Sequence, residues 1–248
     1  MDFPAILSVF SFLVFCLAVY GAASHRKKLG PLAADERDDL SVVQGAAFTL
    51  LGLLVGFTFS MAISRYEQRK SYEEAEANAI GTEYVRVDLL PATDAPKVRE
   101  LLKKYLDQRV LFYTTRDSQL LEQIDTNTAQ LQNEMWSATE ASARTQPTPI
   151  SALAVAGMND VLNSQGYTQA AWWNRIPVEA WILLAVIAAG CNLLFGYGAH
   201  RPSILFVVLP LAVAVSFFLI ADIDSPRGGL IRVRPQNLVS LAQSLHTN

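Results

Sequence analysis

The fold is decided by residues 40–63, LSVVQGAAFTLLGLLVGFTFSMAI, a stretch without a single charged residue. Crossing the roughly 30 Å of hydrocarbon in a bilayer takes about 20 helical residues, and a helix satisfies its own backbone hydrogen bonds in lipid. The stretch therefore predicts a membrane-spanning helix. From Arg65 to Leu90 the sequence has no proline and many good helix formers. One helix from Leu40 to Leu90, about 75 Å long, is expected to end at Pro91.

Three further apolar runs have the length of a membrane span, and Glu179, at the edge of its run, is their only charged residue. Pro4 and Pro202 stand at expected helix starts, where a missing N–H costs little, and Pro210 is expected to kink the last helix. The first run is alternatively a cleaved signal peptide. That interpretation is disfavoured because the basic residues follow the apolar run instead of preceding it. The three runs are residues 4–23, 178–199 and 203–221.

Charged residues are concentrated in one segment of the chain. Hydrophobic residues make up 51% of the sequence and charged residues 17%, against about 25% charge in a typical soluble domain. Residues 65–177 hold 27 of the 43 charged residues. This distribution excludes a soluble globular protein, a disordered chain and a nucleic-acid-binding protein. It predicts an all-α fold: a four-span transmembrane helical bundle with long helical extensions on one side of the membrane.

The predicted spans divide the chain into four segments. The last segment contains leucines and an alanine at positions 238, 241, 242 and 245, which would line one side of a short final helix. The segments are residues 1–64 with the first two spans, 65–177 as an extramembrane helical region that continues the second span, 178–222 with the last two spans, and 223–248 as a C-terminal tail.

The extramembrane segment has the pattern of several further helices. Thr93 or Asp94 is expected to cap the first of them, and a helical period continues to about Ala143. Residues 145–149, rich in Thr and Pro, form a linker to a further helix that is expected to break at Gly166. No strand pattern of any length is present in this segment.

The orientation in the membrane follows from the Lys and Arg residues that flank the spans. Four spans place both termini and residues 65–177 on the same side. Counting all flanking Lys and Arg residues favours the cytoplasm for this side, whereas counting only the short loops weakens or reverses that result. We expect a multi-pass protein of the bacterial inner membrane, with residues 65–177 and both termini in the cytoplasm.

The sequence offers little support for an enzyme. The histidines His25, His200 and His246 are scattered and lack the spacing of metal ligands. There is no glycine-rich phosphate loop and no nucleophile elbow. Cys16 and Cys191 lie inside apolar runs and indicate neither a disulfide nor a metal pair. We therefore expect no enzymatic activity, no cofactor and no metal.

Small residues recur along one face of the second span, largely at steps of four and seven. Small side chains let helices approach closely in lipid, where van der Waals packing drives association. The pattern predicts a helix-packing face, either within one subunit or between subunits. Its members are Gly45, Gly52, Gly56, Ser60 and Ser64.

A second row on the same helix consists of Leu53, Phe57 and Met61, spaced four residues apart. Such a row contacts lipid or a neighbouring helix, or it forms stacked apolar rings in a symmetric oligomer. A narrow apolar ring closes a pore by excluding water. The row is therefore a candidate pore constriction.

Polar residues continue along the same helix beyond the membrane. Glu74, Asn78 and Thr82 share one face, where they contact ions or water on a bundle axis or hydrogen-bond to a neighbouring helix. Glu73, Glu74 and Glu76 form an acidic cluster. We interpret that cluster as a solvated helix face with basic residues nearby, and keep an ion site as the alternative.

Several short motifs resemble the bacterial bestrophin-like domain family. The most specific is EANAIGT at residues 76–82, and the resemblance extends from about residue 40 to residue 245. One motif departs from the family pattern, because Ser225-Pro226-Arg227 stands where Arg-Pro-Phe is expected. The other matching stretches are FTFS at 57–60, RYEQR at 65–69, LLP at 89–91, RIP at 175–177, DIDSP at 222–226 and GLIRV at 229–233.

The resemblance implies a function through the bestrophins, which are pentameric anion channels with four spans per subunit, cytoplasmic termini and a pore lined by the second span. By that analogy we expect a homo-oligomer, with a pentamer as one possible form, that conducts inorganic ions, anions above cations, across the lipid bilayer. The alternative is a membrane scaffold or sensor whose helical extension binds a protein partner. A channel needs a wettable path through a symmetric bundle, whereas a scaffold does not.

Overall fold

A computed structural model describes residues 4–29, 32–199 and 203–247. These residues form eight α-helices and one 3-10 helix, η1, and no strand lies among them. Four helical stretches, Pro4–Leu29, Ala34–Leu89, Ser151–Gly198 and Leu205–Asp224, are long and apolar enough to cross a membrane. The all-α, four-span prediction is confirmed. The helices are α1 (Pro4–Leu29), α2 (Ala34–Arg86), η1 (Val87–Leu89), α3 (Ala95–Thr114), α4 (Ser118–Thr145), α5 (Ser151–Trp173), α6 (Val178–Gly198), α7 (Leu205–Asp224) and α8 (Gln236–Thr247).

Helix α2 has almost the predicted extent. It begins at Ala34 and is α-helical to Arg86, after which η1 makes one tighter turn. Leu90 is extended, with φ −83° and ψ 161°, because the ring of a following proline disfavours the helical conformation in the residue before it. The predicted stop before Pro91 is thus confirmed.

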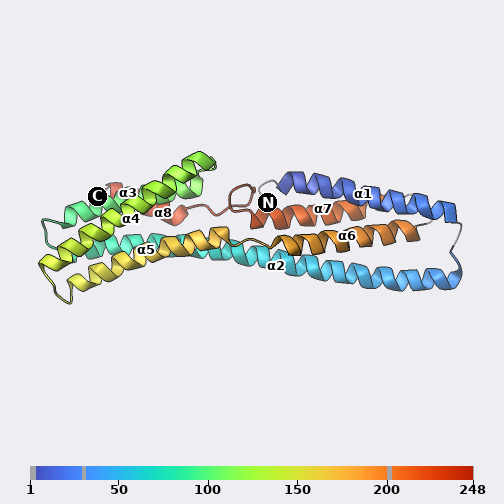
Figure 1. Cartoon of the computed structure of the whole chain (residues 1–248), viewed down its shortest axis with the longest axis horizontal. Coiled ribbons are helices and arrows are strands. Elements are labelled where there is room, and N and C mark those ends of the chain that lie inside the picture. The colour runs from blue at the N-terminus through green and yellow to red at the C-terminus, as the bar shows by residue number, and fades with distance from the viewer. Residues whose placement is uncertain (1–3, 30–31, 200–202, 248) are drawn as a thin grey trace. The chain divides into compact units, whose positions relative to one another are not determined.

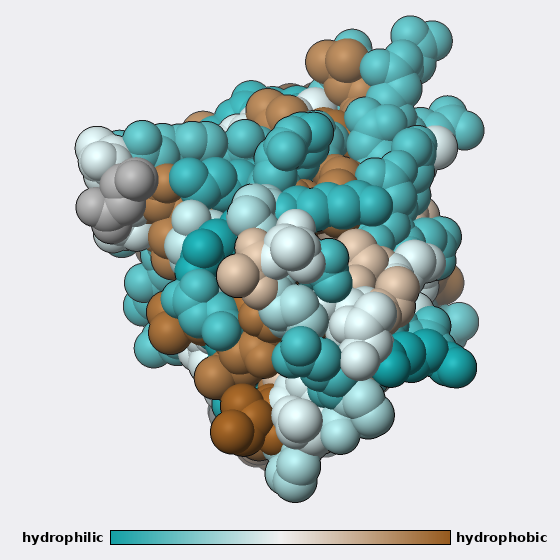
Figure 2. Space-filling view, turned by 90° about the vertical axis from the view of Figure 1, so that its left-hand side faces the viewer, coloured by the Kyte–Doolittle hydropathy of each residue, from teal (hydrophilic) through white to brown (hydrophobic). Residues whose placement is uncertain are grey.

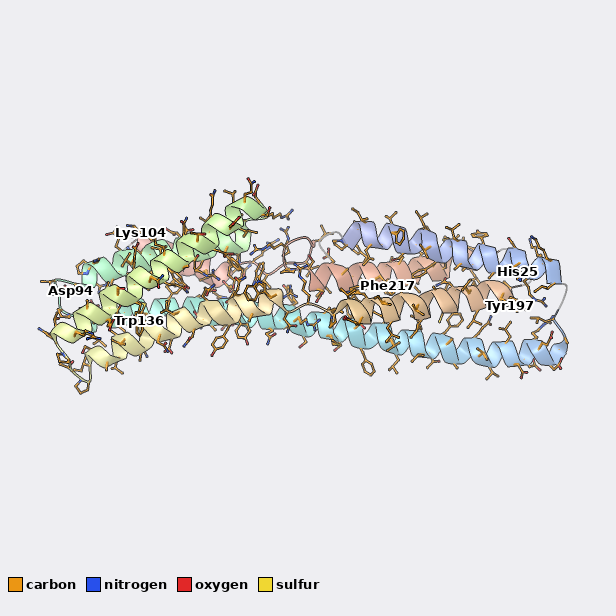
Figure 3. The ribbon with its side chains drawn as sticks, in the orientation of Figure 1. His25, Asp94, Lys104, Trp136, Tyr197 and Phe217 are labelled. Carbon is orange, nitrogen blue, oxygen red and sulfur yellow. The ribbon has the colours of Figure 1, made fainter. Side chains whose placement is uncertain are left out.

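The chain folds as two compact units, and α2 contributes to both. Unit 1 comprises the described residues of Met1–Tyr66 and Arg175–Arg232. In it, α1, α6, α7 and the first part of α2 lie side by side (Figure 1). The Phe217 ring of α7 packs edge-on against Phe15 of α1 and Trp181 of α6, with centroid distances of 5.8 and 5.9 Å (Figure 3). Pro210 lies inside α7, whereas Pro202 is outside the described residues.

Unit 2 comprises the described residues of Glu67–Asn174 and Val233–Asn248, and contains η1, α3, α4, α5, α8 and the last part of α2. Its core includes Val98, Leu102, Tyr105 and Leu106 of α3, all at 0% exposure. The end of this unit that faces the viewer in Figure 2 is mostly hydrophilic. Leu238 and Leu245 of α8 are buried, which confirms the predicted apolar side of the last helix.

Three local predictions in unit 2 need correction. The helical period up to Ala143 is divided into α3 and α4, because the Asp117 carboxylate accepts the N–H groups of Gln119 and Leu120, at 2.8 and 3.1 Å, and so starts a new helix. Asp94 precedes α3, but its side chain makes no capping bond, since its backbone is already helical with φ −103° and ψ −30°.

The third correction concerns Gly166, which is not a break. Helix α5 continues through it to Trp173, because a glycine inside a helix costs only about 1 kcal/mol relative to alanine. The interruption falls instead at residues 174–177, where Pro177 disfavours a helical conformation in the residue before it.

Candidate functional site

In unit 1, helix α2 has a covered face and an open face. The covered face carries Leu51 and Ala62, with 5% and 0% exposure. Every residue predicted for the apolar row lies on the open face: Leu53 is 52% exposed, Phe57 61% and Met61 45%. The predicted small-residue face, Gly45, Gly52, Gly56, Ser60 and Ser64, is exposed as well. Both predicted rows of the span are therefore available to something outside the subunit.

The three glycines of the predicted small-residue face pack against no other described helix of their own chain. A Cβ atom placed on Gly45, Gly52 or Gly56 would meet no described heavy atom within 4 Å. By contrast, a Cβ on Gly196 of α6 would overlap the backbone of Val19 in α1. The close approach of α1 and α6 inside the subunit thus depends on Gly196. Gly45, Gly52 and Gly56 do not pack against other described helices of the same chain.

Two polar side chains inside the spans are bonded to helix backbone. Gln44 of α2 donates from Nε2 to the carbonyl of Leu194 at 2.6 Å, which ties α2 to α6. Asn192 donates from Nδ2 to the carbonyl of Ala188 at 2.7 Å within its own helix. The Gln44 amide thus contributes to helix packing, and both bonds satisfy a polar donor that would be costly to leave unbonded in lipid.

The DIDSP and GLIRV motifs build the turn after α7. The Asp222 carboxylate accepts the backbone N–H groups of Leu230 and Ile231 at 2.7 and 2.8 Å. Gly229 has to be a glycine at this approach, since a Cβ there would overlap the carbonyl oxygen of Asp222. The motif therefore closes a tight turn in unit 1.

The RIP motif joins the same region through the second aspartate. The Asp224 carboxylate accepts the N–H of Ile176 at 3.1 Å and lies 3.5 Å from Nη1 of Arg65. Residues from α2, the α5–α6 connection and the end of α7 thus meet at one carboxylate. The motifs that carried the family resemblance at this end of the spans have a structural role.

In unit 2, Glu74, Asn78 and Thr82 are exposed on the open face of α2. Asn78 and Thr82 border a groove between α2 and α8, which is also lined by Asn237 and Ser240. The groove also has apolar lining residues, among them Val85 and Leu241, so this row of polar side chains lies beside a surface of mixed character. All three residues lie on one face of α2, and their predicted contacts with ions, water or a neighbouring helix stay a prediction.

The covered face of α2 in unit 2 carries a fully buried ion pair. Glu76 pairs with Arg109 of α3, and both side chains have 0% exposure. Glu76 also accepts hydrogen bonds from Thr168 of α5 at 3.1 Å and from Tyr113 of α3 at 3.4 Å. Burial and the nearby Glu76 carboxylate raise the pKa of the Tyr113 hydroxyl, so it stays protonated and donates. One carboxylate thus joins three helices.

Glu73 joins a fourth helix to α2. Its carboxylate accepts the backbone N–H groups of Asn237 and Leu238, at 2.9 and 3.0 Å, and the Asn237 amide at 2.6 Å. These groups form the N-terminus of α8, where free N–H groups and the helix dipole favour an anion. The interpretation of the acidic cluster as a solvated face is therefore wrong for Glu73 and Glu76, and correct for Glu74 alone. No group of three or more His, Cys, Asp or Glu side chains in the described ranges is placed to hold a metal ion.

Sequence reasoning missed the partners of these carboxylates. Arg109 carried a usable signal, because it lies four residues after Tyr105 and three before Phe112 on the apolar side of its helix. A charge at such a position indicates a buried partner. Thr168 carried no comparable signal, since a threonine in a helix is common on any face.

The geometry defines a class of protein: a helical membrane protein with four spans, a second span that continues far beyond the membrane, and an open face along that helix. The comparison with protein families agrees, because the family described as Bestrophin-like domain matches residues 9–238. The chain belongs to the Bestrophin-like domain family. No curated protein matches the chain significantly.

Solved structures of a bacterial Bestrophin homolog from Klebsiella pneumoniae have the same fold. One is 13% identical, with a TM-score of 0.70, and the match covers 96% of this chain and 97% of that chain. A point variant of it is 12% identical, with a TM-score of 0.69 and coverage of 96% and 97%. Another is 13% identical, with a TM-score of 0.66 and coverage of 97% and 98%. At such low identity the likeness shows the fold alone.

Proposed function

We propose that this protein is a homo-oligomeric ion channel whose pore is lined by the open face of α2. The observation that carries the proposal is the exposure of Leu53, Phe57 and Met61 at 52%, 61% and 45%. They lie opposite a covered face that the chain's own helices already fill. A symmetric ring of subunits gives this row neighbours that the single chain lacks.

The apolar row is the proposed constriction. In a ring of subunits, each of the three side chains forms one apolar ring around the axis, and the rings stack because the residues recur every four positions. A narrow apolar ring blocks ions by excluding water, with no bulky plug. Phe57 has the largest side chain of the three, so it makes the tightest ring.

The small-residue face is the proposed contact between subunits. Gly45, Gly52 and Gly56 have open space where a side chain would be, so a neighbouring helix can approach their backbone closely. Ser60 and Ser64 continue this face, and their hydroxyls can bond across it. The close approach of neighbouring α2 helices keeps the apolar rings narrow.

The polar row is the proposed continuation of the ion path beyond the membrane. Asn78 and Thr82 offer amide and hydroxyl donors to an anion, while Glu74 is the one charged member of the row. Selectivity for anions is supported by the likeness to bestrophins. We assign the protein to a bacterial inner membrane, with residues 65–177 and both termini in the cytoplasm, and a pentamer is the expected ring.

The particle mass and ion flux of the purified protein test this function. We expect a detergent-solubilised particle of several subunits, and chloride flux into liposomes that contain it. A monomeric particle would exclude the channel. An intact oligomer without flux of any ion would favour the alternative, a scaffold whose helical extension binds a protein partner.

Cysteine labelling tests the proposed orientation. Single cysteines at Ala33 and Ser118, in a chain whose Cys16 and Cys191 are replaced, are exposed to an impermeant thiol reagent on intact cells. Ala33 immediately precedes the N-terminus of α2, and Ser118 begins α4. We expect labelling at position 33 and none at position 118. The opposite pattern would invert the topology.

A further inference from the structure

Glu83 is a buried carboxyl group on the covered face of α2 in unit 2. Its exposure is 0%, and neither of its carboxylate oxygens has a hydrogen-bond partner among the described residues. Glu76, two turns earlier on the same helix, is equally buried but bonded to Arg109 and Thr168. Burying an unpaired carboxylate costs far more free energy than burying a neutral carboxyl group. The site of Glu83 therefore favours the protonated form.

The space for the Glu83 carboxyl group is supplied by a glycine of α5. A Cβ atom on Gly157 would overlap Oε2 of Glu83 and would lie 2.8 Å from Nη1 of Arg86. A residue with a side chain at position 157 would displace both groups. The contact between α2 and α5 at this level thus consists of a carboxyl group set against bare backbone.

Arg86 and Asp160 are the charged groups that face Glu83. Arg86 lies one turn further along α2, and its Nη1 is 3.9 Å from Oδ2 of Asp160 on α5. The pKa of Glu83 is raised to about 8, chiefly because the carboxyl group is buried; Arg86 opposes this rise and Asp160 adds to it. The Arg86 guanidinium can therefore pair with either of two acidic groups, Asp160 or Glu83.

The cations of the neighbouring helix α3 are engaged elsewhere. Arg99 and Lys103 lie over the ring of Tyr84, at 5.5 and 5.8 Å from its centroid. Arg99 also pairs with Asp88 of η1. Neither cation is among the charges that act on Glu83, which leaves Arg86 as the cation that responds to a charge there.

We propose that Glu83 is a proton-binding site that controls the contact between α2 and α5. With its proton, the neutral carboxyl group packs against Gly157 while Arg86 pairs with Asp160. When the proton leaves to solvent, Arg86 turns from Asp160 to the new carboxylate, and the α2–α5 contact loosens. Thr82, the adjacent residue of the polar row, then shifts with α2. This last step rests on the proposed channel function, and the proton site itself does not.

The direction of the pH effect follows from the two states of the chain. The unfolded chain loses the Glu83 proton near pH 4.5, the ordinary value, whereas the folded chain keeps it to about pH 8. The proton's contribution to stability is therefore complete below pH 4.5 and declines as the pH rises to about 8. Alkaline conditions weaken this contact.

Infrared spectroscopy of the full-length protein in membranes tests the proton site. We expect a carboxyl C=O band that disappears as the pH is raised through about 8. The band should be absent from Glu83→Gln and kept in Glu74→Gln, the matched control, which makes the same change at an exposed position of α2. A parent protein without the band, or a Glu83→Gln variant that keeps it, would overturn the proposal.

Two further measurements test the partner exchange. Asp160→Asn frees Arg86 for Glu83, so the midpoint of the band should fall to a lower pH. Above pH 8, amide hydrogen exchange in residues 151–165 should be faster in the parent than in Glu83→Gln, and equal below it. An unchanged midpoint, or equal exchange at both pH values, would overturn the switch. Neither measurement uses ion flux, so a protein that fails to conduct ions would contradict the channel function without affecting the test of the proton site.

Discussion

The two faces of α2 differ in how their side chains are satisfied. On the covered face, Glu73 and Glu76 accept hydrogen bonds from groups on other helices of the same chain. On the open face, Leu53 and Phe57 are 52% and 61% exposed, and a Cβ atom on Gly56 would meet no atom of another described helix within 4 Å. One side of the helix is packed against described helices of its own subunit and the other is not. The comparison teaches that the covered face holds the subunit together, and that the open face needs lipid, solvent or other copies as its surroundings.

The largest effect on the folded subunit is expected from Glu76→Gln. The change leaves the Arg109 guanidinium buried without a charged partner, and breaking a buried ion pair costs about 3–5 kcal/mol. Glu74→Gln, the same chemical change two residues earlier on the open face, should alter the free energy of unfolding by less than about 0.5 kcal/mol. Thermal unfolding of the detergent-solubilised proteins measures both. Equal losses of unfolding free energy in the two variants would contradict the proposed difference between the two faces.

The spans and the length of α2 were predictable because they depend on composition and local pattern. An uncharged stretch from Leu40 to Ile63 has only one stable form in lipid, and Pro91 marks the stop whatever the tertiary structure. The grouping of Leu53, Phe57 and Met61 on one side was predictable as well, because spacing along one helix fixes which residues share a side, whereas the openness of that side was not. None of this required knowledge of a second helix.

The buried polar contacts were not predictable, since each depends on two distant segments. Glu76 and Glu74 look alike in the sequence, and only the packing of α3 and α5 separates their environments. Glu83 and Gly157 become neighbours only once α5 lies against α2. Gly166 shows the opposite error: a local signal for a helix break was overridden by the packing of α5.

A smaller effect on the subunit, but a large one on assembly, is expected from Gly56→Leu. Open space at Gly56 lets the single chain accept the larger side chain, so its helices should remain folded. In the proposed ring the same side chain holds neighbouring helices apart, and the particle mass should fall to that of a monomer. Native mass spectrometry or light scattering measures the change.

Gly21→Leu is the matched control for that experiment. Gly21 of α1 is also exposed, and a Cβ atom on it would meet no atom of another described helix within 4 Å, but it lies outside the proposed interface. It should leave the particle mass unchanged. If the Gly56→Leu particle also keeps the parent mass, then the small-residue face of α2 faces lipid, and the proposed contact between subunits at this face is wrong.

The smallest effect on the subunit is expected from replacing Leu53, Phe57 and Met61 together by Ala. The three side chains are exposed in the single chain, so their loss leaves no cavity within it. In the proposed pore the change widens the apolar rings and admits water, which should raise ion flux through liposomes. Phe57→Ala alone should give most of the increase, because its ring is the largest.

The alternative explanation is that Leu53, Phe57 and Met61 pack against neighbouring helices. The two explanations predict different stabilities for the oligomer of the triple variant. If the row is pressed against neighbouring helices, each substitution leaves a cavity that costs about 2–5 kcal/mol, and the oligomer should dissociate at lower temperature. Ala substitutions at Ile6, Leu13 and Leu17, exposed by 65%, 55% and 72% on α1, control for the general loss of apolar surface. An intact triple-variant oligomer with no flux above that of the parent would remove the row from the pore. That result would leave the open face of α2 as a site for partner helices, as in the scaffold alternative.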